Sequence, residues 1–190
     1  KDNLSGVNAT YMGLNGGKDL IYETQISMDS LNEGPYKINF FSIDNVENKE
    51  LPKIEEIYLD KTAPVSNLKV MGDKFEGNYI FVSERTEFNI VATDNKAGLK
   101  EIYFSTPSIQ EKIFVDVFKL TGPLGLKDIN FYAIDRVDNS EELKSESFFL
   151  DNKAPNTSIS FGDPSFFIRD TLFISEQSKI SLLAKDDDSG

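Results

Sequence analysis

The amino-acid sequence repeats itself, and the period of the repeat limits the fold more than any other feature does. Asp94 matches Asp2 at a distance of 92 residues, and Asp186 lies a further 92 residues along the chain. The motif Phe-Phe-Ser-Ile-Asp at residues 40–44 returns as Phe-Tyr-Ala-Ile-Asp at residues 131–135. Landmarks in one order and at nearly one spacing predict similar structural units, each of about 92 residues.

The pattern of side chains within one period is typical of β-strands. Phe88, Ile90 and Ala92 fall on one side of an extended chain, and turn residues such as Asn-Gly-Gly at 15–17 separate the strand-like segments. The sequence therefore predicts an all-β fold of tandem immunoglobulin-like β-sandwich repeats, without a disulfide because there is no Cys. The strands expected in one complete repeat are 67–72, 79–83, 86–93, 99–105, 112–120, 127–135 and 146–150.

Two Asp-x-x-Ala-Pro segments, ending at Pro64 and Pro155, predict the domain boundaries. Proline cannot sit in a central strand and stiffens the residue before it, so these segments are expected to be linkers. We expect residues 1–60 to be the later strands of one repeat, 61–151 to be a complete repeat, and 152–190 to be the first strands of a further repeat.

The two incomplete repeats are expected to leave strand edges unpaired. One hypothesis is that residues 152–190 of one molecule pair with residues 1–60 of another. The alternative is that the true boundaries of the fold lie elsewhere in the period.

Composition excludes several classes of function. The chain has 190 residues and a net charge of −12, which lacks the positive surface of a nucleic-acid-binding protein. It contains no Cys, His or Trp, so neither a Ser-His-Asp system nor a usual zinc site is available. Its 32 carboxylates suit hard cations such as calcium. Its apolar runs are too short for a transmembrane helix.

The candidate metal site comes from the topology of the predicted sandwich. Two of its strands, ending at Asp94 and Asp135, run in the same direction in opposite sheets, and the linker with Asp60 arrives at the same pole. Calcium would relieve the repulsion among these carboxylates and would also accept amide oxygens such as that of Asn139. Asp151 and Asp186 are the equivalent residues of the next repeat. The alternative is that each Asp only caps its own turn.

The repeat resembles bacterial immunoglobulin-like repeats of surface proteins, and is most similar to the type named after a leptospiral outer-membrane protein. The matching motifs are Ser-Gly-Val at 5–7, Leu-Asn-Gly-Gly at 14–17, and the Ile-Asp and Asn-Lys-Glu that end the repeat at 43–50. The family pattern has Gly where this chain has Glu47 and Asp138. Glycine suits a left-handed backbone, Asp tolerates it and Glu disfavours it.

This resemblance implies a non-catalytic stalk, spacer or adhesion segment at the bacterial cell surface, associated with the outer membrane or in the periplasm. The expected partners are neighbouring repeats of the same chain and a host or matrix protein or glycan, with no nucleic acid. The segment itself is not expected to be embedded in a membrane, because charged residues interrupt its short strands. The alternative is an accessory carbohydrate-binding β-sandwich attached to a secreted enzyme.

Overall fold

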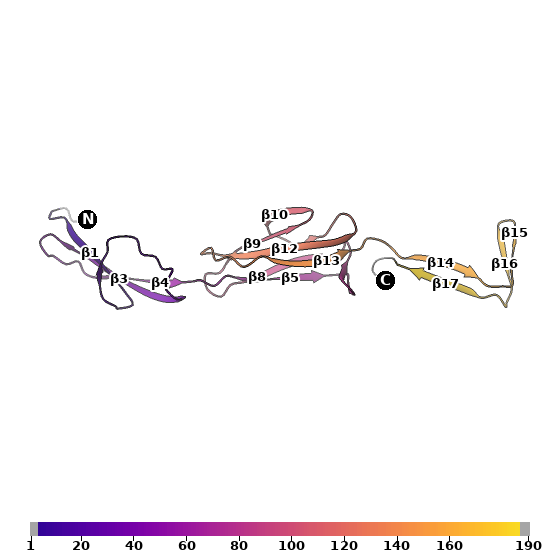
Figure 1. The fold of residues 1–190 in the computed structure, drawn as a ribbon, viewed down its shortest axis with the longest axis horizontal. Helices are drawn as coiled ribbons and strands as arrows, with labels where there is room; N and C mark the ends of the chain where they lie inside the picture. The colour runs from indigo at the N-terminus through magenta and orange to yellow at the C-terminus, as the bar shows by residue number, and fades with distance from the viewer. Residues whose placement is uncertain (1–3, 187–190) are drawn as a thin grey trace. The chain divides into compact units, whose positions relative to one another are not determined.

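The structure is a computed structural model that describes residues 4–186, and within these residues every regular element is a β-strand (Figure 1). The prediction of an all-β fold is therefore confirmed. Two stretches of the sequence repeat, Asp2-Asn3 and residues 187–190, lie outside the described residues.

The chain forms two compact units. The first contains the chain up to Pro64 together with Thr93–Lys100 and Ile134–Ser140, and the second contains the remaining segments. These units are not the predicted domains, because two loops of the predicted middle repeat group with the first unit. The predicted boundaries at residues 60/61 and 151/152 stay a prediction.

The first unit is built on one antiparallel sheet in the order β2-β1-β3-β4. Its strands are β1 (Val7–Leu14), β2 (Leu20–Ile21), β3 (Gly34–Asp44) and β4 (Lys53–Leu59). Tyr11 of β1 lies opposite Phe41 of β3 and stacks on it with ring centroids 5.2 Å apart. Phe41 is buried, whereas most side chains of β4 are exposed.

The second unit contains a β-sandwich. One sheet has the order β10-β9-β12-β13-β7-β6 and the other has the order β11-β8-β5. The strands are β5 (Val65–Met71), β6 (Lys74–Glu76), β7 (Ile80–Val82), β8 (Glu87–Thr93), β9 (Leu99–Thr106), β10 (Ile109–Ile113), β11 (Phe118–Lys119), β12 (Gly125–Asp135) and β13 (Lys144–Leu150).

Aromatic side chains from the two sheets meet in the core of this sandwich. Phe88 of β8 packs edge-on against Phe148 of β13, with centroids 4.9 Å apart, and both are fully buried. Phe104 of β9 packs against Phe118 of β11 at 4.5 Å. Burial of rings of this size is the main stabilising contribution to such a core.

The predicted single strand 112–120 is wrong. β10 pairs with β9 in the six-stranded sheet, whereas β11 pairs with β8 in the other sheet. The intervening residues carry the chain from one sheet to the other, with Val115 exposed and the Asp116 carboxylate accepting a hydrogen bond from the Val117 amide at 2.7 Å. Alternation alone does not reveal such a crossing, because both halves have strand-like sequences.

The C-terminal part of the chain forms two two-stranded antiparallel sheets. They pair β14 (Asn156–Phe161) with β17 (Ile180–Lys185) and β15 (Ser165–Ile168) with β16 (Thr171–Ile174). These strands occupy the positions of β5 to β8 one period earlier. In contrast to β8, however, every residue of β17 is exposed.

Candidate functional site

The site is built from three Asp residues, and the first of them ends β12. One carboxylate oxygen of Asp135 accepts hydrogen bonds from the backbone amides of Val137 and Asn139 at 2.9 and 2.8 Å. The other oxygen accepts one from the Asn139 side-chain amide at 2.7 Å. These bonds close a tight turn in which Asp138 has a left-handed backbone, with φ of 66°. Asp135 is fully buried.

The same turn follows β3 in the first sheet. The Asp44 carboxylate accepts hydrogen bonds from the amides of Val46 and Asn48 at 3.0 and 2.7 Å, and from the Asn48 side chain at 2.8 Å. Glu47 has φ of 67°, so both copies keep the left-handed geometry although neither has Gly there. Capping by Asp and Asn is sufficient to hold a residue that disfavours this conformation.

The second Asp of the site follows β8. One oxygen of Asp94 accepts hydrogen bonds from the backbone amides of Lys96 and Gly98 at 2.9 and 2.7 Å. These two bonds hold the pKa of Asp94 below its ordinary value of 3.8 and outweigh the opposite effect of burial. The loop needs a left-handed residue at Gly98, where φ is 85°.

The third Asp lies in the linker after β4. One oxygen of Asp60 accepts a hydrogen bond from the Thr62 amide at 3.1 Å, and the other accepts one from the Ala97 amide at 2.8 Å. The backbone carbonyl of Asp60 accepts a hydrogen bond from the Asn139 side chain at 3.2 Å. The linker is thus bonded to both of the loops that carry the other two Asp residues.

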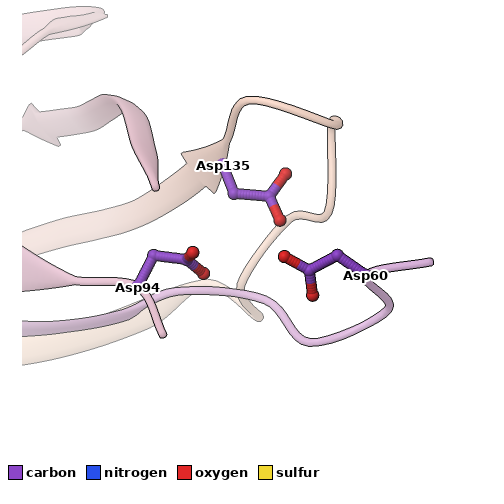
Figure 2. Close-up of side chains that lie close together, drawn as sticks. All are labelled: Asp60, Asp94 and Asp135. Atoms are coloured by element: carbon purple, nitrogen blue, oxygen red, sulfur yellow. The ribbon is translucent and has the colours of Figure 1, made fainter. Parts of the chain in front are cut away.

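The three carboxylates converge, as Figure 2 shows. Asp60, Asp94 and Asp135 each offer an oxygen atom, and these atoms lie within 4.8 Å of one another. All three residues belong to the first compact unit. Among the described residues, no lysine or arginine forms a salt bridge with any of them.

One atom of the group lacks a hydrogen-bond partner. The second carboxylate oxygen of Asp94 is buried and accepts no hydrogen bond, although its other oxygen accepts two. A buried charged oxygen without a partner is costly, because it has lost water and gained nothing in return. A cation held by the three carboxylates would satisfy it.

The structure brings together three of the six predicted ligands. Asn139 lies beside them, but its side-chain nitrogen donates to Asp135 and to the backbone of Asp60, so it positions the acids. Asp151 caps its own linker by accepting a hydrogen bond from the Lys153 amide at 2.9 Å. Within residues 4–186, no group of three acidic residues includes Asp151 or Asp186.

Two polar contacts at these turns were not predicted. The Ser5 hydroxyl donates a hydrogen bond to Asp44 at 2.8 Å, and the Ala97 amide donates one to Asp60. For Ser5 a signal was present in the sequence, because Ser5-Gly6 lies at the place in the repeat where Ala97-Gly98 returns. The backbone donor of Ala97 gives no signal of its own in a side-chain pattern.

The chemistry of the group fits a hard cation. Three carboxylates supply at least three oxygen ligands and a local charge of about −3, and calcium takes roughly six to eight oxygen ligands. The remaining ligands would be water or second carboxylate oxygens. The role of the ion in such a site is to neutralise the acids and to hold their loops together.

No protein-family model matches this chain, and no curated protein matches it. A similar solved structure is that of the fibronectin(III)-like modules of Clostridium thermocellum CbhA, at 10% sequence identity and a TM-score of 0.42. The match covers 80% of this chain and 82% of that chain. The resemblance to the leptospiral repeat type stays a prediction. No helix in residues 4–186 is long and apolar enough to cross a membrane.

Proposed function

We propose that this chain is a non-catalytic segment of immunoglobulin-like modules in which calcium binds to Asp60, Asp94 and Asp135. The ion ties the linker after β4 to the loops that follow β8 and β12. Its function is to restrict the movement of the linker, so that successive modules act as a spacer or as an adhesion segment.

The observation that carries the proposal is the buried oxygen of Asp94 that has no partner. Turn capping accounts for one oxygen of each Asp, because at all three residues one oxygen accepts a hydrogen bond from a backbone amide of its own turn. It does not explain why one oxygen of each carboxylate lies within 4.8 Å of the other two while, among the described residues, no salt bridge is made to any of the three. Like charges at that distance repel, and a bound cation would remove this repulsion.

The test is thermal unfolding of the chain in EDTA and in millimolar calcium, followed by circular dichroism. Binding to the folded state alone stabilises by about 2.7 kcal/mol at one hundred times Kd, which raises the midpoint by roughly 5–11 °C for a chain of this length. The rise is expected to disappear in Asp94→Asn and to persist in Glu142→Gln, an exposed acid outside the site. An equal midpoint in EDTA and calcium for the unchanged chain contradicts the proposal.

The wider setting of the proposal is a bacterial surface or periplasmic protein. The 92-residue period supports this setting, because repeats that contact only their neighbours behave as a one-dimensional array whose length is the useful property. A cation bound at each linker would restrict bending between repeats, so that the array would keep a fixed length. Neighbouring repeats, or a host or matrix protein or glycan, are the partners in this proposal.

A second candidate function is carbohydrate binding by an accessory β-sandwich, and a group of aromatic side chains favours it. Phe75 and Tyr79 are exposed beside Phe81 and Phe149, and Tyr79 stacks on Phe149 with centroids 5.8 Å apart. Aromatic faces of this kind can pack against sugar rings. Titration with soluble oligosaccharides tests this function: binding that is lost in Tyr79→Ala supports it, and no binding contradicts it.

A further inference from the structure

The sheet of the first unit carries an apolar groove that corresponds to the core of the β5–β13 sandwich. The groove has a volume of about 590 Å³ and is lined by Met12, Leu20, Ile26 and Met28, among others. Met12 and Ile26 lie one period before two core rings of the sandwich, those of Phe104 and Phe118. In the sandwich, Phe104 packs against Phe118 of the opposite sheet, whereas Ile26 in the first unit is 52% exposed.

The C-terminal strands carry apolar side chains that no other part of the described chain covers. Ile180 and Leu182 of β17 are 56% and 70% exposed. The residues one period earlier, Phe88 and Ile90 of β8, are 0% and 2% exposed. The residues on this face of β17 are apolar, as in β8, but no second sheet of the described chain packs on them. A two-stranded sheet alone is only marginally stable in water.

Within residues 4–186, two strand edges that are paired in the sandwich are unpaired one period away. In the sandwich, β13 pairs with β12 on one side and with β7 on the other, where Phe149 lies opposite Phe81 in parallel register. One period away, β4 pairs only with β3 and β16 pairs only with β15 among the described strands. The residues that correspond to this register are Tyr58 in β4 and Phe173 in β16.

We propose that β1–β4 of one copy and β14–β17 of a second copy complete each other as one sandwich with the arrangement of β5–β13. Ile180 and Leu182 of the second copy enter the groove of the first, and β16 adds to the open edge of β4. The second copy is the occupant because it carries the apolar face, the strand edge and the register that the groove lacks. The interface is already present, within one chain, between β5–β8 and β9–β13.

A polar contact supports the same pairing. In the sandwich, the Glu141 carboxylate accepts a hydrogen bond from the Ser66 amide at 2.9 Å and another from its hydroxyl. The corresponding residues are Glu50, in the first unit, and Thr157, which also has a hydroxyl. The second copy thus offers Glu50 the donor that Glu141 finds in its own chain.

The completed sandwich also assembles a second group of carboxylates. Asp44 of one copy corresponds to Asp135, while Asp151 and Asp186 of the second copy correspond to Asp60 and Asp94. Neither copy holds all three by itself. This part of the inference rests on the proposed function, and it predicts that calcium strengthens the association.

Because the two surfaces differ, the contact is heterologous and leads to head-to-tail chains or closed rings. Sedimentation velocity of the full chain in EDTA, over a range of concentrations, is expected to show oligomers that increase with concentration. Leu182→Asp is expected to weaken the association at least about 100-fold, because it places a charge in the apolar groove.

Leu183→Asp is the matched control, since neighbouring residues of a strand face opposite sides. A monomer at every concentration, or equal loss in both variants, overturns the inference and assigns these faces to another partner, such as flanking segments of a longer protein.

Cross-linking tests the register, and the absence of Cys makes it specific. Copies with Tyr58→Cys are mixed with copies with Phe173→Cys under mild oxidation, and a mixed disulfide is expected. Ile159→Cys on β14 replaces Phe173→Cys in the control mixture. Equal yields in the two mixtures overturn the inference.

A calcium arm separates this inference from the proposed function. Calcium is expected to strengthen the association of the unchanged chain and not that of Asp186→Asn. Association in EDTA without any thermal effect of calcium supports the completed sandwich and contradicts only the proposed cation site. A thermal effect of calcium that depends on Asp94, in a chain that stays monomeric, supports the cation site and overturns the completed sandwich.

Discussion

The turns at the ends of β3 and β12 have the same hydrogen bonds and different surroundings. In each, Asp44 or Asp135 accepts bonds from the amides two and four residues later, and the following Asn side chain donates to the same carboxylate. Asp135 is fully buried and lies beside Asp60 and Asp94, whereas Asp44 is partly exposed and accepts the hydroxyl of Ser5.

This difference separates the shape of the turn from its chemistry. The shape comes from residues inside the turn, so it survives both the exposed and the buried setting. Burial and the convergence of carboxylates come from two other segments, the linker with Asp60 and the loop with Asp94. A local motif therefore becomes a candidate cation site only where those segments arrive.

The largest expected effect on stability comes from removing the carboxylates of Asp135 and Asp44, one turn at a time. Asp135→Ala is expected to lower the free energy of unfolding by about 3 kcal/mol, because three donors in a buried turn lose their acceptor. Asp44→Ala is expected to have a smaller effect, since water reaches its donors. Urea unfolding gives the free energies, and hydrogen exchange at Val137 and Val46 assigns each loss to its turn. Equal losses contradict the role of burial.

The next largest effect is expected from Asp94→Asn, and its size depends on calcium. In EDTA the variant is expected to unfold at a lower temperature than the unchanged chain, because a charged carboxylate is a better acceptor than an amide for the Lys96 and Gly98 backbone amides. In calcium the difference is expected to widen, with affinity for the ion reduced at least about tenfold. Isothermal titration calorimetry measures the affinity. An equal difference in EDTA and in calcium contradicts the cation site.

The pH dependence tests the turn after β3 and the loop after β8, because each holds an Asp whose pKa is lowered in the folded state. Burial by itself raises the pKa of Asp44, but hydrogen bonds from Asn48, Ser5 and Val46 together bring it below the ordinary 3.8. The pKa of Asp94 is lowered as well. A lowered pKa in the folded state adds stability that is present above about pH 4 and lost as the pH falls through the folded-state pKa.

The measurement is unfolding between about pH 2 and pH 6, with NMR titration of the two side chains. Stability is expected to fall below about pH 4, and Asp44→Asn is expected to make that fall shallower. Calcium is expected to move the acid transition to lower pH in the unchanged chain and not in Asp94→Asn. A transition that calcium leaves in place contradicts binding at the Asp94 group.

The smallest expected effect concerns the left-handed residue of each turn. Glu47→Gly is expected to stabilise the first unit by about 0.5–1 kcal/mol, because Gly adopts φ of 67° without steric cost. Asp138→Gly is expected to gain less, since Asp tolerates this conformation better and also pairs with Lys100 at 2.7 Å. Urea unfolding of the two variants measures the difference. A loss of stability in Glu47→Gly contradicts this account.

Most of the sandwich could be predicted from alternation and the repeat. The segments 86–93, 99–105 and 127–135 are strands β8, β9 and β12, because buried rings such as Phe88 alternate with half-buried residues. The change of sheet after β10 could not be predicted, since it depends on which strand the chain meets next. The loops 93–100 and 134–140 group with the first unit, and this too depends on tertiary contacts that the sequence pattern does not reveal.

For the candidate site, topology predicted which acids meet and failed to predict how they are bonded. Asp60, Asp94 and Asp135 converge because two strands end at the pole where the linker enters. The sequence contains no sign that Asn139 would use its nitrogen toward the group, or that one oxygen of Asp94 would be left without a donor. Both depend on side-chain rotation inside a packed loop.

The parallel pairing of β7 with β13 has a mechanical consequence. When the chain is pulled from both ends, tension enters this sandwich from the side of β5 and leaves it just after Leu150, which lies opposite Val82. The Asp151 amide donates one more hydrogen bond to the Val82 carbonyl, at 2.9 Å. Parallel strands pulled in this way slide along their length, so their hydrogen bonds are strained together instead of being peeled apart one by one. We expect the sandwich to resist stretching at this seam, and atomic-force extension of Val82→Pro, which weakens the seam, measures the contribution.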